Sequence, residues 1–107
     1  MGMNVNQSII CSAIKSRNLI SFYYTGDDRP GIRTVEPFMI AHTSKDHLSL
    51  SAWFLYGASE SGDGQGWRDY LLSDISQISV LPQTFLGNRP GYRRDGGKKF
   101  HNVLCAL

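Results

Sequence analysis

Cysteines and long apolar runs are both scarce in this sequence. It has two cysteines in 107 residues, Cys11 and Cys105. No stretch approaches the ~20 apolar residues of a membrane span, and the first residues lack the basic lead and apolar run of a secretion signal. We therefore expect a cytoplasmic protein without membrane contact. Both cysteines lie in apolar contexts, which indicates buried free thiols rather than a disulfide.

Catalytic motifs are also missing. No nucleophile motif is present, and the three histidines, at positions 42, 47 and 101, lack the spacing of metal ligands. The glycine-rich run at residues 62–66 is not followed by the Lys-Ser/Thr pair of a phosphate-binding loop, which favours a flexible connector. The sequence therefore predicts a binding protein rather than an enzyme, with no catalytic residue, metal or cofactor.

The charge is modest and unevenly distributed. Charged residues make up 19% and hydrophobic residues 41% of the chain, as in folded globular domains. Residues 1–85 hold six basic and eight acidic residues, whereas residues 86–107 hold five basic residues and one acidic residue. The second part is either a solvated turn or a contact for nucleic acid. Its candidate nucleic-acid contacts are Arg93, Arg94, Lys98 and Lys99.

The spacing of apolar residues changes once along the chain. A stripe with helical period predicts a helix over about residues 5–17. Alternation then predicts strands at 20–24, 48–53 (with extension to 56) and 75–81, and we expect further strands at 33–42, 67–72 and 100–107. Because proline cannot donate to a sheet ladder, we expect Pro37 to break the second strand or place it at an edge, and Pro82 to end the fifth.

Five or six short strands behind one helix predict a mainly β fold. The whole chain, residues 1–107, is long enough for one domain. We expect a small closed or partly closed barrel over about residues 19–81, followed by a basic loop and the last strand in residues 82–107. On the third strand, residues 47, 49, 51 and 53 share the face away from the core. This face is either a polar binding surface or ordinary solvent-facing strand, and its Trp53 either packs under a loop or stacks on a partner.

Several short motifs, in this order, resemble the WYL-domain family of bacterial regulators. The similarity extends over residues 9–85 and rests on motifs in the right order. These motifs are the entry helix with Ile9, Ala13 and Ile14, then Ile-Ser-Phe-Tyr-Tyr at 20–24, Arg-Thr-Val-Glu-Pro at 33–37, Trp-Arg-Asp-Tyr-Leu-Leu-Ser-Asp-Ile at 67–75, and Val80.

The resemblance implies an SH3-like or Sm-like barrel that senses an effector, usually behind a helix-turn-helix, with nucleotides or single-stranded nucleic acid as ligands. Two features depart from the family pattern. The Trp-Tyr-Leu that gives the family its name falls here at residues 46–48, where only Leu48 is kept, and no helix-turn-helix accompanies the domain. The tail, residues 85–107, is similar to that of short stand-alone WYL-like proteins.

Arg33 and Arg68 match arginines of the family motif and are the leading candidates for a site. A guanidinium presents a planar fork of donors that suits phosphate or carboxylate. The alternative is a structural ion pair with Glu36, Asp69 or Asp74. The other candidate ligand-binding residues are His47, Tyr24, Trp53 and Tyr70.

We therefore expect a ligand-binding or regulatory module that senses a nucleotide, an oligonucleotide or another anionic ligand in a bacterial regulatory setting, such as transcription regulation. The alternative is a protein-interaction or oligomerisation module without a small ligand, in which exposed aromatic residues and edge strands contact another chain or a second copy.

Overall fold

The chain begins with one amphipathic helix, α1 (Val5–Ser16), in a computed structural model that describes residues 4–58 and 64–107. The Asn4 side chain caps its start by accepting a hydrogen bond from the Gln7 N–H at 2.8 Å. Arg17 ends it in the left-handed region (φ 59°). Its buried face is formed by Ile10, Ala13 and Ile14. The helix predicted from the apolar stripe is therefore confirmed to within one residue.

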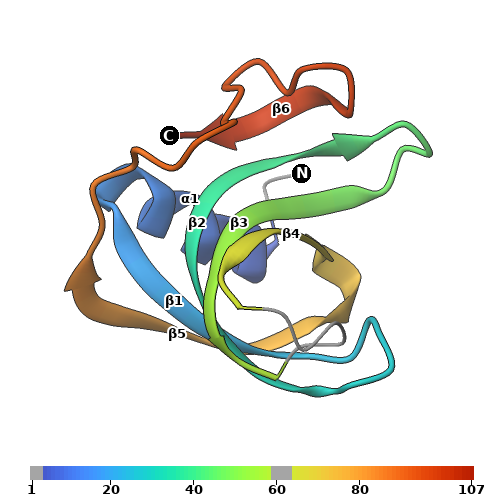
Figure 1. Cartoon of the computed structure of the whole chain (residues 1–107). Helices are drawn as coiled ribbons and strands as arrows, with labels where there is room; N and C mark the ends of the chain where they lie inside the picture. The colour runs from blue at the N-terminus through green and yellow to red at the C-terminus, as the bar shows by residue number, and fades with distance from the viewer. Residues whose placement is uncertain (1–3, 59–63) are drawn as a thin grey trace.

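Six antiparallel strands follow the helix in the described residues. They are β1 (Asn18–Tyr24), β2 (Gly31–Thr43), β3 (Leu48–Gly57), β4 (Gly66–Leu71), β5 (Ile75–Thr84) and β6 (Phe100–Ala106), with a 3-10 turn, η1 (Leu72–Asp74), between β4 and β5. The sheet runs in the order β4-β3-β2-β1-β5, and β6 pairs with β2. The strands curve around the core, and α1 lies behind them (Figure 1). The predicted mainly β class is therefore confirmed.

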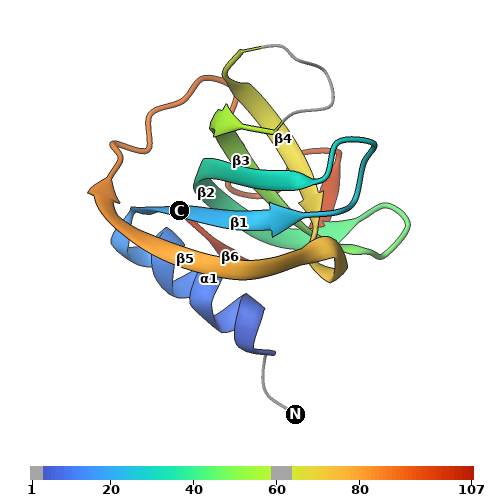
Figure 2. The ribbon, with the colours of Figure 1, turned by 90° about the horizontal axis from the view of Figure 1, so that it is seen from below.

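The sheet is open at β4 and β5. These two strands end the path of paired strands, and no pairing between described residues joins one to the other. Figure 2 shows α1 alongside β5, on the side of the sheet that the helix covers. The hydrogen bonding thus defines a strongly curved sheet with a helix packed on it, not a closed barrel.

Both prolines lie inside strands. β2 continues through Pro37, so the first of the two alternatives for this residue, a break, is wrong, and β5 continues to Thr84, so the predicted end at Pro82 is wrong. Pro37 lies in β2 between the residues that pair with β1 (31–35) and those that pair with β6 (39–43). A register shift against β3 follows it. Pro82 lies in β5, an edge strand that pairs only with β1 in the part of the chain that the structure describes. In both places part of the strand edge carries no partner strand, which is where a sheet tolerates a residue without an N–H.

The core lies on both faces of β2, and residues 33–41 are buried without interruption. The main cluster packs under α1 and includes Ile14, Phe22 and Leu50. A smaller cluster on the other face joins Met39 and Ala41 to Phe100 of β6. The expectation of a solvent-facing side on the third strand is wrong, because the C-terminal part of the chain covers that face. Ser49 and Ser51 are buried there.

The two cysteines form a disulfide between α1 and β6, so the prediction of free thiols is wrong. Cys105 pairs with Ile40 across the sheet, and α1 packs on β2 and β6, which brings the Cα atoms of Cys11 and Cys105 to 5.8 Å. The bond joins residues that are 94 positions apart, a proximity that no local pattern can reveal. Among the described residues, no helix is both long and apolar enough to cross a membrane.

Candidate ligand-binding site

Arg33 lies in the interior, with a side chain that is 2% exposed. Its guanidinium donates two hydrogen bonds to the carboxylate of Asp27, at 3.0 and 2.9 Å, and a third to the carbonyl of Arg29. Its carbon Cζ lies 4.9 Å from the ring centre of Tyr24 and 5.8 Å from that of Tyr70. The donor fork is thus engaged with Asp27, and an anionic ligand would have to replace that carboxylate.

Tyr24 and Tyr70 are buried beside Arg33 in a cluster of edge-to-face rings that includes Phe22. Burial raises the pKa of the Tyr24 hydroxyl and raises the pKa of the Tyr70 hydroxyl to about 12. The Tyr24 hydroxyl accepts a hydrogen bond from the Leu71 N–H at 3.0 Å. Both tyrosines therefore stay neutral and serve the packing of this cluster around Arg33.

The ion pair of the Asp27 carboxylate should make the free energy of unfolding sensitive to acid. Its hydrogen bonds from Arg33 lower its pKa below the usual 3.8. A carboxyl with a lowered pKa in the folded state binds protons more readily when unfolded, so its stabilisation is present above pH 3.8 and lost as the pH falls toward the lower folded value. We expect the difference in unfolding free energy between wild type and Asp27→Asn to shrink below about pH 4. Urea denaturation from pH 7 to pH 3 measures it.

Asp28→Asn is the matched control for this titration, because Asp28 is the neighbouring, exposed carboxylate. Asp28→Asn should show the same acid-dependent loss of unfolding free energy as the wild type. A difference between wild type and Asp27→Asn that stays constant down to pH 3 would contradict the role given to the ion pair.

The other candidates from the sequence lie in separate places. Arg68 donates hydrogen bonds to the carbonyls of Trp67 and Gly64, and its Cζ lies 5.3 Å from the Phe54 ring centre. His47 is exposed in the turn before β3. Trp53 is half-buried on the outer face of β3, with its ring against Trp67 and under the guanidinium of Arg89. The structure therefore groups Arg33, Tyr24 and Tyr70 but does not bring His47 or Trp53 to them.

Residues 85–99, here called the connecting segment, run from β5 to β6 across the outer face of the sheet. Arg89 forms a two-bond ion pair with the buried Glu36 of β2, both bonds at 2.8 Å. The Trp67 indole N–H donates to the carbonyl of Pro90 at 2.6 Å. Gly96, at φ 88°, packs so closely that a Cβ there would lie 2.7 Å from the Phe100 carbonyl oxygen. These contacts hold the segment in a defined path over β3 and β4.

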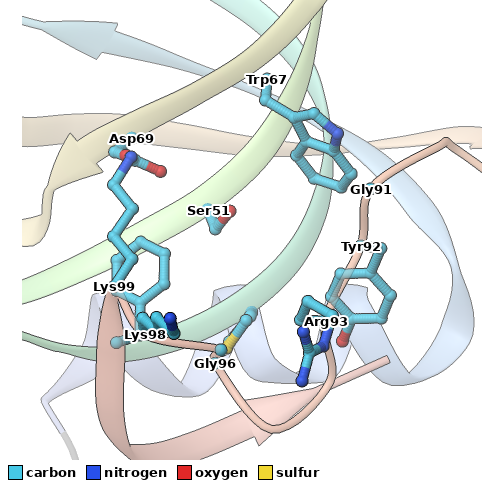
Figure 3. A pocket seen from close by; sticks show the side chains of 12 residues that line it. Ser51, Trp67, Asp69, Gly91, Tyr92, Arg93, Gly96, Lys98 and Lys99 are labelled. Carbon is cyan, nitrogen blue, oxygen red and sulfur yellow. The ribbon is translucent and has the colours of Figure 1, made fainter.

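A pocket of about 260 Å³ opens between the connecting segment and the sheet. Met39, Ser51, Trp67 and Asp69 contribute to it from the strands, and residues 91–93 and 96–100 from the other side. Figure 3 shows the Trp67 and Tyr92 rings along one side and the two lysines on the other. The Trp67 and Tyr92 rings are nearly parallel, at 21°, with centres 6.1 Å apart. The site thus offers flat aromatic surfaces beside a polar rim.

Basic side chains from the connecting segment form the rim of the pocket. Arg93, Lys98 and Lys99 line it, and the Lys99 side chain is 69% exposed. Lys99 pairs with Asp69 on β4 across the pocket, and Arg93 pairs with Asp95 at 3.4 Å. Within residues 4–58 and 64–107, Lys98 forms no ion pair. The rim therefore carries more positive than negative charge and can meet an anionic group.

Arg94 belongs to a different surface from the other basic candidates. It lines a groove with Lys15, Arg17 and the two cysteines, on the α1 side of β6. The basic cluster seen in the sequence is thus divided between two faces. Three of its four candidate nucleic-acid contacts lie at the pocket, and the fourth lies near the disulfide.

Sequence reasoning missed the floor of this pocket. Met39, Ser51 and Asp69 come from strands that are far from the connecting segment in sequence, and Tyr92 lies in a stretch of Pro and Gly that indicates only a loop. The available signals were the basic cluster itself and the outward Trp67. Neither could show that the tail folds back over β3 and β4.

The titratable groups of the described part offer no metal centre, since no three or more His, Cys, Asp or Glu side chains gather in a way that could hold an ion. Comparison of the chain with protein-family models, with curated proteins and with solved structures finds no match.

Proposed function

We propose that this chain is a ligand-binding regulatory module, and that the pocket under the connecting segment takes a nucleotide or the end of a single-stranded oligonucleotide. The observation that carries the proposal is the combination, in one pocket, of the Trp67 and Tyr92 rings with Arg93, Lys98 and Lys99. Aromatic side chains stack on bases, and basic groups bind phosphate. This places the predicted anionic ligand at a site other than Arg33 and Arg68.

The size of the pocket favours a ligand of one ring system. Sites for drug-sized molecules measure roughly 300–1,000 Å³, whereas this pocket measures about 260 Å³. A base lies inside, against the aromatic rings and Met39, and the phosphate remains at the rim near Lys98 and Lys99. A phosphate at the rim also competes with Asp69 for Lys99.

The resemblance to WYL domains supports this proposal as an expectation about fold and role. We propose that the curved sheet with its helix is an SH3-like arrangement whose opening lies between β4 and β5. The regulatory role, the cytoplasmic location and the lack of enzymatic activity belong to the same proposal. A disulfide is rare in the reducing cytoplasm unless it is transient or senses redox state.

A titration with adenosine 5′-monophosphate tests the proposed site. We expect binding to change the tryptophan fluorescence, because Trp67 lines the pocket. In Lys98→Ala/Lys99→Ala the affinity should fall about tenfold or more, since hydrogen bonds to charged groups contribute about 1.5–3 kcal/mol. The affinity of the wild type should also fall as salt is raised. Isothermal titration calorimetry at two salt concentrations provides the dissociation constants.

The matched control removes the same charge elsewhere. Lys15→Ala/Lys45→Ala takes away two exposed lysines that do not line the pocket, so its affinity should equal that of the wild type. Equal losses in both double variants would show nonspecific attraction. If neither the mononucleotide nor a short single-stranded oligonucleotide binds, and the chain self-associates instead, the protein-interaction alternative replaces this proposal.

A further inference from the structure

The Cys11–Cys105 disulfide is the one covalent tie between the N-terminal helix and the C-terminal strand in the described structure. β6 contributes Phe100 to the wall of the pocket and anchors the end of the connecting segment. Whatever releases β6 therefore also releases one side of the pocket.

β6 is paired along one edge. Within the described residues it pairs with β2 alone, over residues 39–43, with a register shift in the middle, and Leu104 and Cys105 pack, partly buried, against the main cluster. The Leu107 N–H donates to the Phe38 carbonyl at 2.9 Å, and the Tyr92 hydroxyl donates to the Leu107 carbonyl at 3.1 Å. Most of the other residues of β6 are half-buried or exposed. Such a strand has a low cost of local opening compared with the central strands β2 and β3.

The disulfide is open to attack from solvent. Both cysteines are half-buried and line an open groove of about 680 Å³ on the side of α1. The same groove is lined by Lys15, Arg17 and Arg94, and none of the acidic side chains in residues 4–58 and 64–107 lines it. Thiol–disulfide exchange needs access and a thiolate. Three cationic groups around the bond raise the local concentration of an anionic thiol.

We propose that Cys11–Cys105 is a redox latch, opened by a small anionic thiol or by a dithiol, that controls whether β6 and the connecting segment close the pocket. The thiolate attacks one sulfur, forms a mixed disulfide with that cysteine, and displaces the other cysteine as a thiolate. A second thiol then attacks the mixed disulfide. Both cysteines end as protonated thiols, and the two reductant thiols end as one disulfide. The consequence for the pocket rests on the proposed function, whereas the release of β6 does not.

Hydrogen exchange of the full chain tests the release directly. We expect reduction by dithiothreitol to speed amide exchange in β6 at least about tenfold, because its local opening loses a tether, and in the reduced protein β6 should exchange faster than β1 and β3, whose exchange needs unfolding of the whole domain. Cys11→Ala/Cys105→Ala should show the fast β6 exchange without reductant and should not respond to it. Unchanged β6 exchange after complete reduction overturns the latch. Exchange of β6 at the same rate as β1 and β3 in the reduced protein overturns it as well, because β6 would then open only when the whole domain unfolds.

Ligand affinity separates the latch from the proposed function. Adenosine 5′-monophosphate should bind the reduced protein about tenfold more weakly than the oxidised protein. If the nucleotide binds neither form while β6 still responds to reduction, the proposed function fails and the release of β6 stands. If it binds both forms equally, the coupling of latch and pocket is wrong.

Reduction by thiols of opposite charge tests whether the basic groups of the groove favour an anionic thiol. Glutathione, an anionic thiol, should open the bond several-fold faster than cysteamine, a cationic thiol, once rates are corrected for thiolate fraction. The difference should shrink in high salt and in Lys15→Ala/Arg94→Ala. Equal corrected rates in the wild type would show that the basic groups do not select the thiol and would overturn that part of the proposal.

Discussion

Arg33→Lys should lower the free energy of unfolding by about 3 kcal/mol. Lysine cannot reproduce the hydrogen-bond geometry of this buried ion pair, so the Asp27 carboxylate is left poorly compensated. Lysine keeps the charge but cannot reproduce two parallel hydrogen bonds to Asp27 together with a third to the Arg29 carbonyl. It also loses the flat contact with Tyr24. Urea denaturation, followed by circular dichroism, measures the loss.

Arg29→Lys is the control for this variant. Residue 29 is exposed and serves Arg33 only through its backbone carbonyl, so the substitution should leave stability within about 0.5 kcal/mol of wild type. Arg33→Lys should bind adenosine 5′-monophosphate as the wild type does, because Arg33 does not line the pocket. If Arg33→Lys had normal stability but did not bind the nucleotide, the ligand site would have to be assigned to Arg33.

Loss of the disulfide should have an effect of similar size. Cys11→Ala/Cys105→Ala is expected to lower the free energy of unfolding by about 3–5 kcal/mol, since a bridge that closes a loop of about 100 residues restricts the unfolded chain strongly. The two cysteines are 94 positions apart. The domain should remain folded, because small domains are typically stable by about 5–15 kcal/mol.

A double-mutant cycle isolates the bond from the packing of the two sulfur atoms. Each single variant, Cys11→Ala or Cys105→Ala, already breaks the bridge, so the double variant should be little less stable than either one. Strictly additive losses would show that the cysteines contribute only as separate small apolar groups. The wild type should match the double variant in the presence of excess dithiothreitol.

Local patterns predicted the elements that depend on local forces. The apolar stripe of α1 and the alternation in β1 correspond to faces that the structure buries, and the bounds of both elements differ from the predicted ones by only a few residues. The Arg33 ion pair was one of two readings open from the sequence, although the expected acidic partners did not include Asp27. Whether Arg33 forms a structural ion pair or binds a ligand depends on how deeply its side chain is buried, and burial is set by the whole fold.

The features that the sequence did not predict are all long-range. The sequence could not show whether Pro37 breaks its strand or lies at an unpaired edge, or that Pro82 lies inside its strand, because strand pairing is a property of the assembled sheet. Ser49 and Ser51 read as a surface because the alternation cannot show that residues 85–106 cover them. The disulfide required both the packing of α1 and the pairing of β6, neither of which has a local signature.

The pairing of β6 with β2 also orders the steps of folding. β1, β2, β3 and β4 pair with their neighbours in sequence, whereas β1 also pairs with β5, and β2 with β6, across long stretches of chain. Closing a longer loop costs more chain entropy, so non-local pairings form after local ones. We therefore expect the hairpins to assemble first and the two long-range pairings, β1 with β5 and β2 with β6, to follow, so that the cysteines meet late. The pocket is thus a late product of folding, complete only when the last strand has docked.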